Sequence, residues 1–566
     1  MERGISGQRW LILEELHQAP LSLVKKYGKV IAQLLYNRRD IFNKEFSEDY
    51  IYPTLEKLIP PQEFINLNKI ALKLADAIKK KKRIAIYGDY DADGITSTAL
   101  LANFLYDIGV KTKYYIPSRF SEGYGLNKKA IKKISQIADV LIVLDSGTNA
   151  HEELKFASDL GLEVFVLDHH EPKELDWNYD RVNILNPKLS NDISPYFKHL
   201  STVGIVFYLM ITLRKILNLN IKLKPYLDIV AIGTVADVVP LSIINRILVK
   251  KGLEEINKRH RPGIRAILEN LSIKEVNSFD VSFQIAPRIN AAGRLDDAKK
   301  AVKLLISRDL KQSRQLAKEL ENLNRRRQKI TETVFKESQI SIKEQGFSNS
   351  IVIANESWHA GVIGIVAGRL LEKYKVPSIV LSIQDDEYAV GSVRSTPEIN
   401  IYKILEKHSY LFEKFGGHSM AAGLTIKRSN IPKLQKIIEE EIERFEKEEP
   451  ILEIDMNVPP SYWDEKSFKQ LSVLEPFGEG NPYPKFVGRS VRIQDFITVG
   501  SEGQHIKFWL KEEKTKKTFQ AMWWGAKNYL RDLSVGQIID MVYTPKLSYW
   551  NGNSSITFII YDIKIH

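Results

Sequence analysis

Three carboxylates at alternate positions, Asp89, Asp91 and Asp93, follow an apolar run that ends at Gly88. Ionised carboxylates this close together repel one another, so a folded chain tolerates them when protons or metal ions compensate their charge. Mg²⁺ and Mn²⁺ prefer oxygen ligands and are the expected compensating ions at neutral pH. This stretch therefore predicts a divalent-metal site.

The same D-x-D-x-D-G pattern also opens an EF-hand calcium loop. An EF-hand needs a glutamate at its twelfth position, which counted from Asp89 is Leu100, and it needs a helix before the loop. Residues 83–87 are instead β-like in composition, so the calcium loop is rejected. On this stretch alone, a solvated acidic turn stays open as an alternative.

Four further candidate ligands follow other apolar runs: Asp145, His169, His170 and Asp237. Taken singly, an aspartate in such a place is more often a helix cap, and a histidine pair is more often structural. From about residue 60 to 300, however, short apolar runs alternate with amphipathic helices, which is typical of a parallel α/β sheet. Functional loops of such sheets gather at the carboxyl ends of the strands. The pattern predicts that these side chains meet at one edge of one sheet.

Oxygen ligands with one imidazole suit two Mn²⁺ or Mg²⁺ ions. Such a pair generates a hydroxide and stabilises the attacking and leaving oxygens of phosphoryl transfer, so no protein nucleophile is required. The region has no Walker lysine motif and no dinucleotide glycine fingerprint, which argues against NTPase and dehydrogenase functions. The predicted metal ligands are Asp89, Asp91, Asp93, Asp145, His169 and Asp237.

In their order along the chain, these segments resemble the motifs of the DHH phosphoesterase family, named after the triplet that is Asp168-His169-His170 here. The family consists of metal-dependent phosphoesterases, among them exonucleases, small-nucleotide phosphodiesterases and pyrophosphatases. The resemblance implies that Asp91, His169 and His170 are catalytic. His170 would assist the leaving oxygen, orient a phosphate or support a metal ligand.

Seven residues are candidate substrate contacts: Arg119, Tyr124, Arg288, Arg294, Ser392, Arg394 and His418. Arg119 precedes a glycine-flexed turn in which Tyr124 is available for base stacking, and pairing of Arg119 with Glu122 is the alternative. Ser392 and Arg394, with nearby backbone amides, are expected to anchor a terminal phosphate.

Composition bounds the remaining possibilities. A chain of 566 residues is too long for one core and predicts roughly three or four domains. It contains no cysteine, which excludes disulfides, zinc-thiolate sites and thiol nucleophiles. Lysine and arginine number 82 against 70 acidic residues, and the net charge of +12 favours anionic partners, nucleic acid first. We find no membrane-spanning apolar run and no secretory signal, so the expected location is cytoplasmic, with no membrane partner.

The expected order of domains is an N-terminal arm at 1–50, a parallel-sheet domain at 51–305, a connecting helix at 306–345, a smaller α/β domain at 346–447, and a linker with a barrel at 448–566. Gly416-Gly417-His418 resembles the signature of the DHHA1-type domain that accompanies DHH domains and holds the substrate. Short strands with interleaved lysines and aromatics fit an OB-fold that stacks bases. The expected fold is therefore α/β, with a parallel-sheet DHH domain, a long helix, a DHHA1-type domain and a C-terminal OB-fold barrel.

This combination is similar to the bacterial exonucleases of the family that are specific for single strands. The resemblance implies metal-dependent degradation of single-stranded DNA from 5′ to 3′, with release of 5′-mononucleotides in repair and recombination. Single-strand-binding protein and a RecQ-type helicase are the implied partners.

Two alternatives remain open at this point. A DHH phosphodiesterase of short oligonucleotides or cyclic dinucleotides would share the metal site but would have little use for the barrel. A non-enzymatic single-strand-binding replication factor should have lost metal ligands, and none is missing here.

Overall fold

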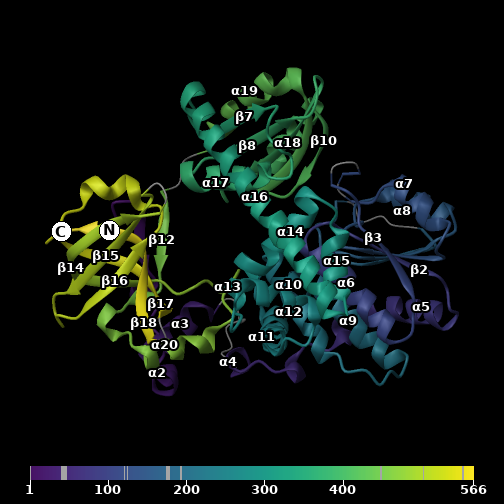
Figure 1. Cartoon of the computed structure of the whole chain (residues 1–566), viewed down its shortest axis with the longest axis horizontal. Coiled ribbons are helices and arrows are strands. Elements are labelled where there is room, and N and C mark those ends of the chain that lie inside the picture. Colours follow the sequence, from purple (N-terminus) through teal and green to yellow (C-terminus); the bar gives the residue numbers. More distant parts are fainter. Residues whose placement is uncertain are drawn as a thin grey trace.

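The computed structural model describes residues 2–39, 48–119, 122–123, 125–173, 179–190, 194–445, 449–500, 503–550 and 553–566. They form a large α/β domain, a smaller α/β domain and a β-barrel unit, which Figure 1 shows at the right, the top and the left of the molecule. Within this described part, no helix combines the length and the apolar character needed to cross a membrane.

The large domain is built on a five-stranded parallel sheet in the order β3-β2-β4-β5-β6. In chain order, these strands are β2 (Ile84–Gly88), β3 (Thr112–Tyr115), β4 (Val140–Leu144), β5 (Glu163–Leu167) and β6 (Val182–Leu185). The predicted parallel sheet is confirmed. The chain reverses its direction of winding between β2 and β4, and doubly wound sheets bind their ligands at this switch point, beyond the carboxyl ends of the strands.

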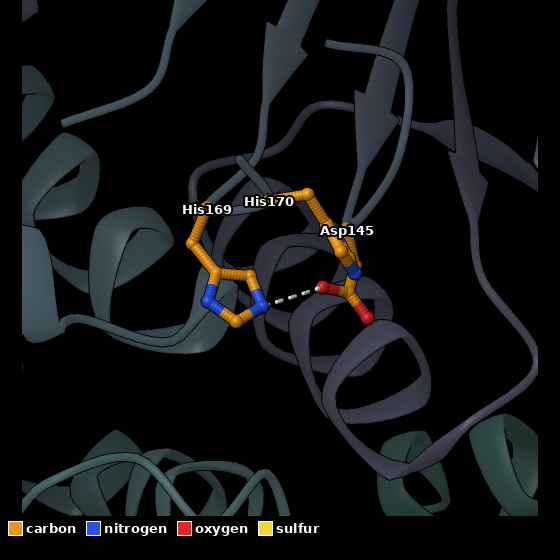
Figure 2. A group of neighbouring side chains, drawn as sticks. All are labelled: Asp145, His169 and His170. Atoms are coloured by element: carbon orange, nitrogen blue, oxygen red, sulfur yellow. Dashed lines mark ion pairs between the residues drawn. The ribbon is translucent and has the colours of Figure 1, made fainter. Parts of the chain in front are cut away.

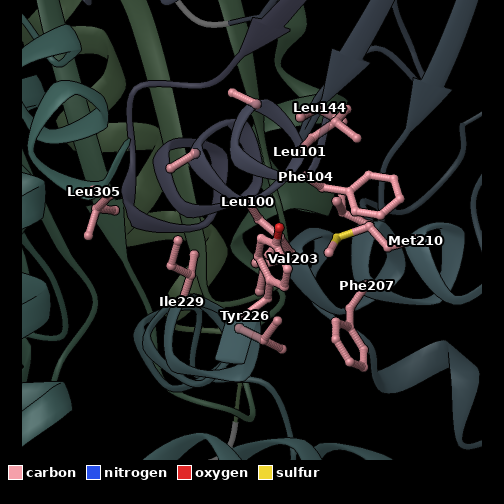
Figure 3. Close-up of a cluster of buried hydrophobic side chains, with 14 of the residues drawn as sticks. Leu100, Leu101, Phe104, Leu144, Val203, Phe207, Met210, Tyr226, Ile229 and Leu305 are labelled. Atoms are coloured by element: carbon pink, nitrogen blue, oxygen red, sulfur yellow. The ribbon is translucent and has the colours of Figure 1, made fainter. Parts of the chain in front are cut away.

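Both faces of the sheet are covered by helices, because the strands are apolar on both sides. On one face lie α6 (Ala92–Asp107) and α9 (Thr202–Ile216), in the largest hydrophobic cluster; Figure 3 shows part of it, with side chains from both helices and from β4. On the other face lie α7 (Lys128–Ser135) and α8 (His151–Asp159).

The apolar segment before Asp237 is a helix, α10 (Leu227–Ala236), buried from Leu227 to Thr234. Burial on all sides removes the helical periodicity from its sequence.

One long helix, α16 (Leu310–Gln345), joins the two α/β domains. The sequence predicts a connecting helix at 306–345, and in the structure Asp309 caps the helix, since its carboxylate accepts hydrogen bonds from the backbone N–H groups of Lys311 and Gln312. Leu320 lies in the core of the large domain, whereas Phe335 lies in a core shared with the smaller domain. A helix of this length spans ~54 Å and fixes the two domains to a common element.

The smaller domain has a mixed sheet in the order β10-β11-β9-β8-β7, in which only β7 and β8 are parallel. Its elements are β7 (Ile351–Asn355), α17 (Ile363–Tyr374), β8 (Ser378–Ile383), β9 (Tyr388–Arg394), α18 (Ile401–Lys407), β10 (Phe412–Gly417), β11 (Ala421–Lys427) and α19 (Ile431–Ile442).

The barrel closes through pairing of its first strand with its fourth, β14 with β17. Its strands are β14 (Phe486–Val499), β15 (His505–Glu512), β16 (Thr518–Trp523), β17 (Ile538–Trp550) and β18 (Asn553–Ile565). The short strands expected at 486–488 and 491–493 are one continuous strand, and the glycine between them lies next to a bulge in the pairing with β17. The expected OB-like barrel is confirmed.

The N-terminal arm packs against the barrel unit. Strand β1 (Arg9–Ile12) pairs in parallel with β12 (Ile451–Ile454), which precedes the barrel. Helix α3 (Lys29–Asn37) places Leu34 and Leu35 in the hydrophobic core of the barrel unit. The arm therefore completes a core at the far end of the sequence, a contact that local sequence patterns do not reveal.

The other α-helices of the described residues are α1 (Leu13–Leu16), α2 (Leu21–Tyr27), α4 (Glu48–Ile51), α5 (Leu67–Lys79), α11 (Ile243–Lys258), α12 (Pro262–Leu271), α13 (Ser278–Asp280), α14 (Ala286–Leu295), α15 (Lys299–Ile306) and α20 (Glu465–Leu471). A π-helical turn, Val281–Ile285, joins α13 to α14.

A single buried arginine of α11 holds the arm and the barrel linker on the large domain. The Arg246 guanidinium donates to the backbone carbonyls of Tyr50 in the arm and of Val473, Leu474, Glu475 and Pro476 in the linker. It also lies 3.7 Å from the centroid of the Tyr50 ring.

Replacing Arg246 by methionine should lower the free energy of unfolding by about 3–5 kcal/mol, because buried carbonyls lose their donor and no water replaces it. Urea unfolding followed by circular dichroism measures the change. Arg265→Met is the matched control, since Arg265 pairs with Glu269 at the surface and such pairs contribute at most about 1 kcal/mol. Equal losses in the two variants would contradict the role given to Arg246.

Candidate active site

The loop after β2 is shaped by its own carboxylates and by one glycine. The Asp91 side chain caps α6 by accepting a hydrogen bond from the Gly94 N–H at 3.0 Å. A Cβ at Gly94 would lie 2.6 Å from the backbone of Asp89, so the tight approach requires glycine. Asp89 is buried, and its Oδ1 has no hydrogen-bond partner within the described residues. A buried carboxylate oxygen without a hydrogen-bond donor is typical of a metal ligand.

Asp93 faces the N-terminus of α9. Its carboxylate accepts hydrogen bonds from the backbone N–H groups of Thr202 at 2.6 Å and Val203 at 3.0 Å. These two donors anchor the side chain from a segment more than a hundred residues away. Thr202 also donates from its hydroxyl to Asp145 at 2.9 Å, so the start of α9 positions two of the predicted ligands.

Three groups of side chains gather at the switch point with ligand atoms within 4.8 Å of one another. They are Asp145 with His169 and His170, Asp93 with His169 and Asp237, and Asp89 with Asp91 and Asp145. His169 Nε2 lies 3.5 Å from Asp145 Oδ1 (Figure 2). The same nitrogen lies 3.4 Å from Asp237 Oδ2. The groups overlap through Asp145 and His169, which is the arrangement expected when neighbouring ions share ligands.

The charge state of these groups also favours cations. Burial raises the pKa of Asp89, Asp145 and Asp237 well above the usual value, and neighbouring carboxylates add to each shift. Burial and Asp91 raise the pKa of Asp93 to about 7. Burial, with His170 beside it, lowers the pKa of His169 to about 3, so its imidazole is neutral and able to bind a metal. Oxygen ligands with one neutral imidazole fit Mn²⁺ or Mg²⁺.

Asp168 holds the histidine pair in place. Its carboxylate accepts hydrogen bonds from the N–H groups of Thr148, His169 and His170, and from His170 Nδ1 at 2.7 Å. Burial would raise the pKa of Asp168, but these bonds, chiefly the one from His170, bring it below the usual value. Burial would lower the pKa of His170, but Asp168 raises it to about 9, so His170 is a cation at neutral pH.

A second set of side chains is basic and comes from three elements. Arg119 follows β3, Arg294 lies on α14, and Arg394 ends β9. Burial first and then Arg119 lower the pKa of Arg294 to about 10, and the same two causes lower the pKa of Arg394. Among the described residues, no carboxylate lies within ion-pair distance of these three guanidinium groups. Mutually repelling cations without counter-charges predict an anionic ligand.

Ser392 and the first turn of α17 complete this set. Arg394 Nη1 donates to Ser392 Oγ at 3.3 Å and to the backbone carbonyl of Val393 at 2.8 Å. A Cβ at Gly364 would lie 2.9 Å from Ser392 Oγ and 3.4 Å from Arg394 Nη2, so the helix start and the two side chains are in close contact. The N-terminus of a helix adds backbone donors and a positive field for an anion.

Comparisons with known proteins assign the chain to a family. Family models match the DHH family N-terminal domain at residues 83–234, the DHHA1 domain at 348–444 and the RecJ OB domain at 454–562. The single-stranded-DNA-specific exonuclease RecJ of Haemophilus influenzae is 33% identical over 557 residues, which cover 93% of this chain and 94% of that protein. The RecJ of Bacillus subtilis is 33% identical over 563 residues, covering 98% of this chain and 69% of that protein. The chain belongs to the RecJ family.

The fold agrees with this assignment. The crystal structure of RecJ from Thermus thermophilus in complex with Mn²⁺ matches with a TM-score of 0.84 and 28% identity, covering 99% of this chain and 80% of that one. A second structure, of the same protein in complex with Mg²⁺, matches with a TM-score of 0.77. RecJ relatives thus bind, in crystals, the two ions that the ligand set here is suited to hold.

Within the RecJ family fold, the structure brings most of the predicted residues together but not all. The His418 ring of the smaller domain stacks on that of His170, with centroids 6.0 Å apart and planes at 18°. Arg288, a predicted substrate contact, instead pairs with Glu321 of α16 at 2.6 Å. Tyr124 lies outside the described residues. The alternative pairing of Arg119 with Glu122 is not found, because the Glu122 carboxylate accepts from Tyr115 and from the Ser118 N–H.

Sequence reasoning missed several residues of the site. Asp168 was read only as part of a motif, although its place directly after a buried strand was the same signal used for Asp145. Lys188 and Lys198 line a cavity together with His169 and Asp237, and Lys188 pairs there with Glu171. They belong to no motif, and only the folded chain places them beside the predicted metal ligands.

Proposed function

We propose that this chain is a metal-dependent exonuclease that removes 5′-mononucleotides from single-stranded DNA, starting at the 5′ end. One observation carries the proposal: a cluster of side chains on the large domain that could hold metal ions lies near arginines that have no ion-pair partner among the described residues, and one of these, Arg394, belongs to the smaller domain. The relatives named single-stranded-DNA-specific exonuclease RecJ support the choice of substrate. A role in repair and recombination follows from the same family.

In this proposal, Arg119, Ser392 and Arg394 hold the 5′-phosphate, and the nearby Arg294 adds positive charge to the same site. A guanidinium and a hydroxyl together match the donors that a phosphate requires. Anchoring the terminal phosphate places the first phosphodiester bond beside the acidic cluster. Binding at the end of the strand then explains release of one nucleotide at a time.

The metal site would use Asp89, Asp91, Asp93, Asp145, His169 and Asp237 to hold two Mn²⁺ or Mg²⁺ ions. When bound, such ions supply a hydroxide nucleophile and stabilise the charge that develops on phosphate oxygens. His170 is protonated and held by Asp168, so it can donate a proton or a hydrogen bond to the leaving 3′-oxygen. His418 stacks on His170 and keeps its ring in place.

The barrel would bind the strand beyond the active site. The outward side chains of β15 and β16 include Lys507 and Trp509, with the ammonium 5.1 Å from the indole ring. Trp524 follows at the end of β16, 57% exposed. Aromatic faces with lysines between them stack bases without sequence preference and attract the phosphate backbone. Single-strand-binding protein and a RecQ-type helicase remain proposed partners, and such a substrate implies a cytoplasmic location.

The experiment that tests the proposal uses a long single strand labelled at the 5′ or the 3′ end, incubated with Mn²⁺, Mg²⁺ or chelator. We expect metal-dependent release of mononucleotides from the 5′ end, lost in Asp91→Ala. Release from the 3′ end, or cleavage confined to short oligonucleotides or cyclic dinucleotides, would overturn the proposed polarity or substrate. Binding without metal-dependent turnover would indicate a replication factor instead.

Replacing Gly364 by alanine should raise KM for a 5′-phosphorylated strand by about 10-fold, the effect of one weakened charge-assisted hydrogen bond. The added methyl group would displace Ser392 Oγ and crowd Arg394. Gly368→Ala is the matched control on the same helix, because a Cβ there meets no atom within 4 Å. Steady-state kinetics with 5′-phosphorylated and 5′-hydroxyl strands measure both. A change of equal size in the two variants would contradict the phosphate role.

A further inference from the structure

Two phenylalanines of the large domain lie side by side in solvent. Phe279 of α13 and Phe283 of the π-helical turn are 41% and 65% exposed. Their ring centroids are 4.6 Å apart and the ring planes are inclined by 32°. Phe283 is the most exposed phenylalanine of the described residues. Exposed apolar side chains that cluster mark interaction sites, and single π-helical turns occur frequently at functional sites.

The barrel contributes a positive charge to the same place. The Lys546 ammonium of β17 lies 5.6 Å from the centroid of the Phe279 ring. Figure 1 shows α13 on the side of the large domain that faces the barrel. The site therefore combines two aromatic faces from one unit with a cation from another. This combination suits a ligand that has both flat rings and phosphates.

The helix that bears these rings leads to the active site. From Phe283, the chain continues without a break through α14 to Arg294, eleven residues later. At the helical rise, this separation is ~16 Å. Gly293 of the same helix touches the backbone of Tyr90 in the acidic loop, where an added Cβ would lie 2.3 Å from the Tyr90 oxygen. At the ~3.4 Å spacing of stacked nucleotides in one strand, 16 Å corresponds to about five nucleotides.

We propose that Phe279, Phe283 and Lys546 form a stacking platform for bases of the single strand, about four to seven nucleotides from its 5′ end. The inference rests on the proposed function and deepens it, because it gives the strand a defined path between the active site and the barrel. The bases stack on the two rings, and Lys546 contacts a phosphate. Stacking on rings accepts any base, so the platform contributes affinity without sequence preference.

The test compares the wild-type protein with the Phe279→Ala/Phe283→Ala variant in Mn²⁺. The substrates are a 5′-phosphorylated thymidine 20-mer and the same strand with abasic positions four to seven. Release of the first nucleotide below saturation gives kcat/KM, and a 5′-phosphorylated trinucleotide, too short to reach the rings, is the reference substrate. Phe347→Ala is the matched control, since Phe347 is also 41% exposed but contacts Tyr374 of the smaller domain instead.

We expect the double variant to lose about 10- to 100-fold in the ratio of kcat/KM for the 20-mer to that for the trinucleotide. The wild type should lose a similar factor on the abasic strand, whereas the double variant should lose nothing further there. Full activity of the double variant on the 20-mer, or an equal abasic penalty in both proteins, would overturn the platform and point to a protein partner. Failure of the proposed function has a different outcome: the wild type would release no nucleotide from any strand.

Discussion

Replacement of Asp145 by asparagine should lower kcat for nucleotide release by about 10³-fold, the upper range for loss of one group that stabilises transition-state charge. Asp145 belongs to two of the three ligand groups and is 1% exposed, so neither water nor another side chain can take its place. Asparagine keeps the shape and the hydrogen bond from Thr202 but removes the charge that binds the cation. Single-turnover release of a 5′-labelled nucleotide measures the loss, and calorimetric titration with Mn²⁺ measures the ligand role.

The matched control lies on the same strand. Asp139 precedes β4 and Asp145 follows it, so the two carboxylates mark opposite ends of one strand. Asp139 pairs with Arg83 at the surface. Asp139→Asn should lower the free energy of unfolding by at most about 1 kcal/mol and leave kcat unchanged. A normal kcat for Asp145→Asn, or a similar fall in the two variants, would show that the carboxyl edge of the sheet is not the metal site.

In the metal-free protein, the same cluster of carboxylates should make the thermal stability depend on pH. The pKa of Asp93 is raised to about 7, so its contribution to stability is present at low pH and is lost as the pH rises through 7. In chelator, we therefore expect Tm to be lower at pH 8 than at pH 6. Mn²⁺ should raise Tm more at pH 8, because its ligands must be deprotonated. Asp145→Asn should raise Tm in chelator and reduce the Mn²⁺-induced increase.

The sequence predicts the site best where the relevant signal is local. An apolar run followed at once by a carboxylate predicts both a buried strand and a side chain at its end, and this was enough to place Asp89 and Asp145 at one edge. The long helix could also be predicted, because apolar residues recur at helical spacing without interruption after Asp309, which caps the helix.

Distant contacts account for what the sequence did not predict. Arg288 and Arg294 look alike along the chain, but Glu321 of α16 neutralises the first, whereas the second lies near Arg119 and Arg394. The packing of the N-terminal arm could not be predicted from local patterns, because the residues that it contacts lie more than four hundred residues away. Asp237 follows a helix rather than a strand. The sequence does not distinguish the two, because a segment that is buried on every side has no hydrophobic periodicity.

Asp168 shows the same limit within the active site, since a carboxylate at the end of a strand can bind either a metal ion or a neighbouring side chain. It accepts four hydrogen bonds and is 1% exposed. Its geometry makes it a positioning residue for His170 rather than a ligand. Asp168→Asn should lower kcat by about 10²- to 10⁴-fold. An amide has one acceptor oxygen in place of two and carries no charge, so it no longer stabilises His170 as a cation.

A double-mutant cycle with His170→Gln distinguishes this role from a general loss of structure. If Asp168 acts through His170, the double variant should be little worse than the more damaging single variant, as for residues that work as a unit. Mn²⁺ affinity should fall by only about 10- to 100-fold in Asp168→Asn, through displacement of His169. Multiplied losses in kcat would mean that Asp168 acts independently of His170. Complete loss of Mn²⁺ binding would instead make Asp168 a ligand, and the triplet would then hold the metal through two of its three side chains.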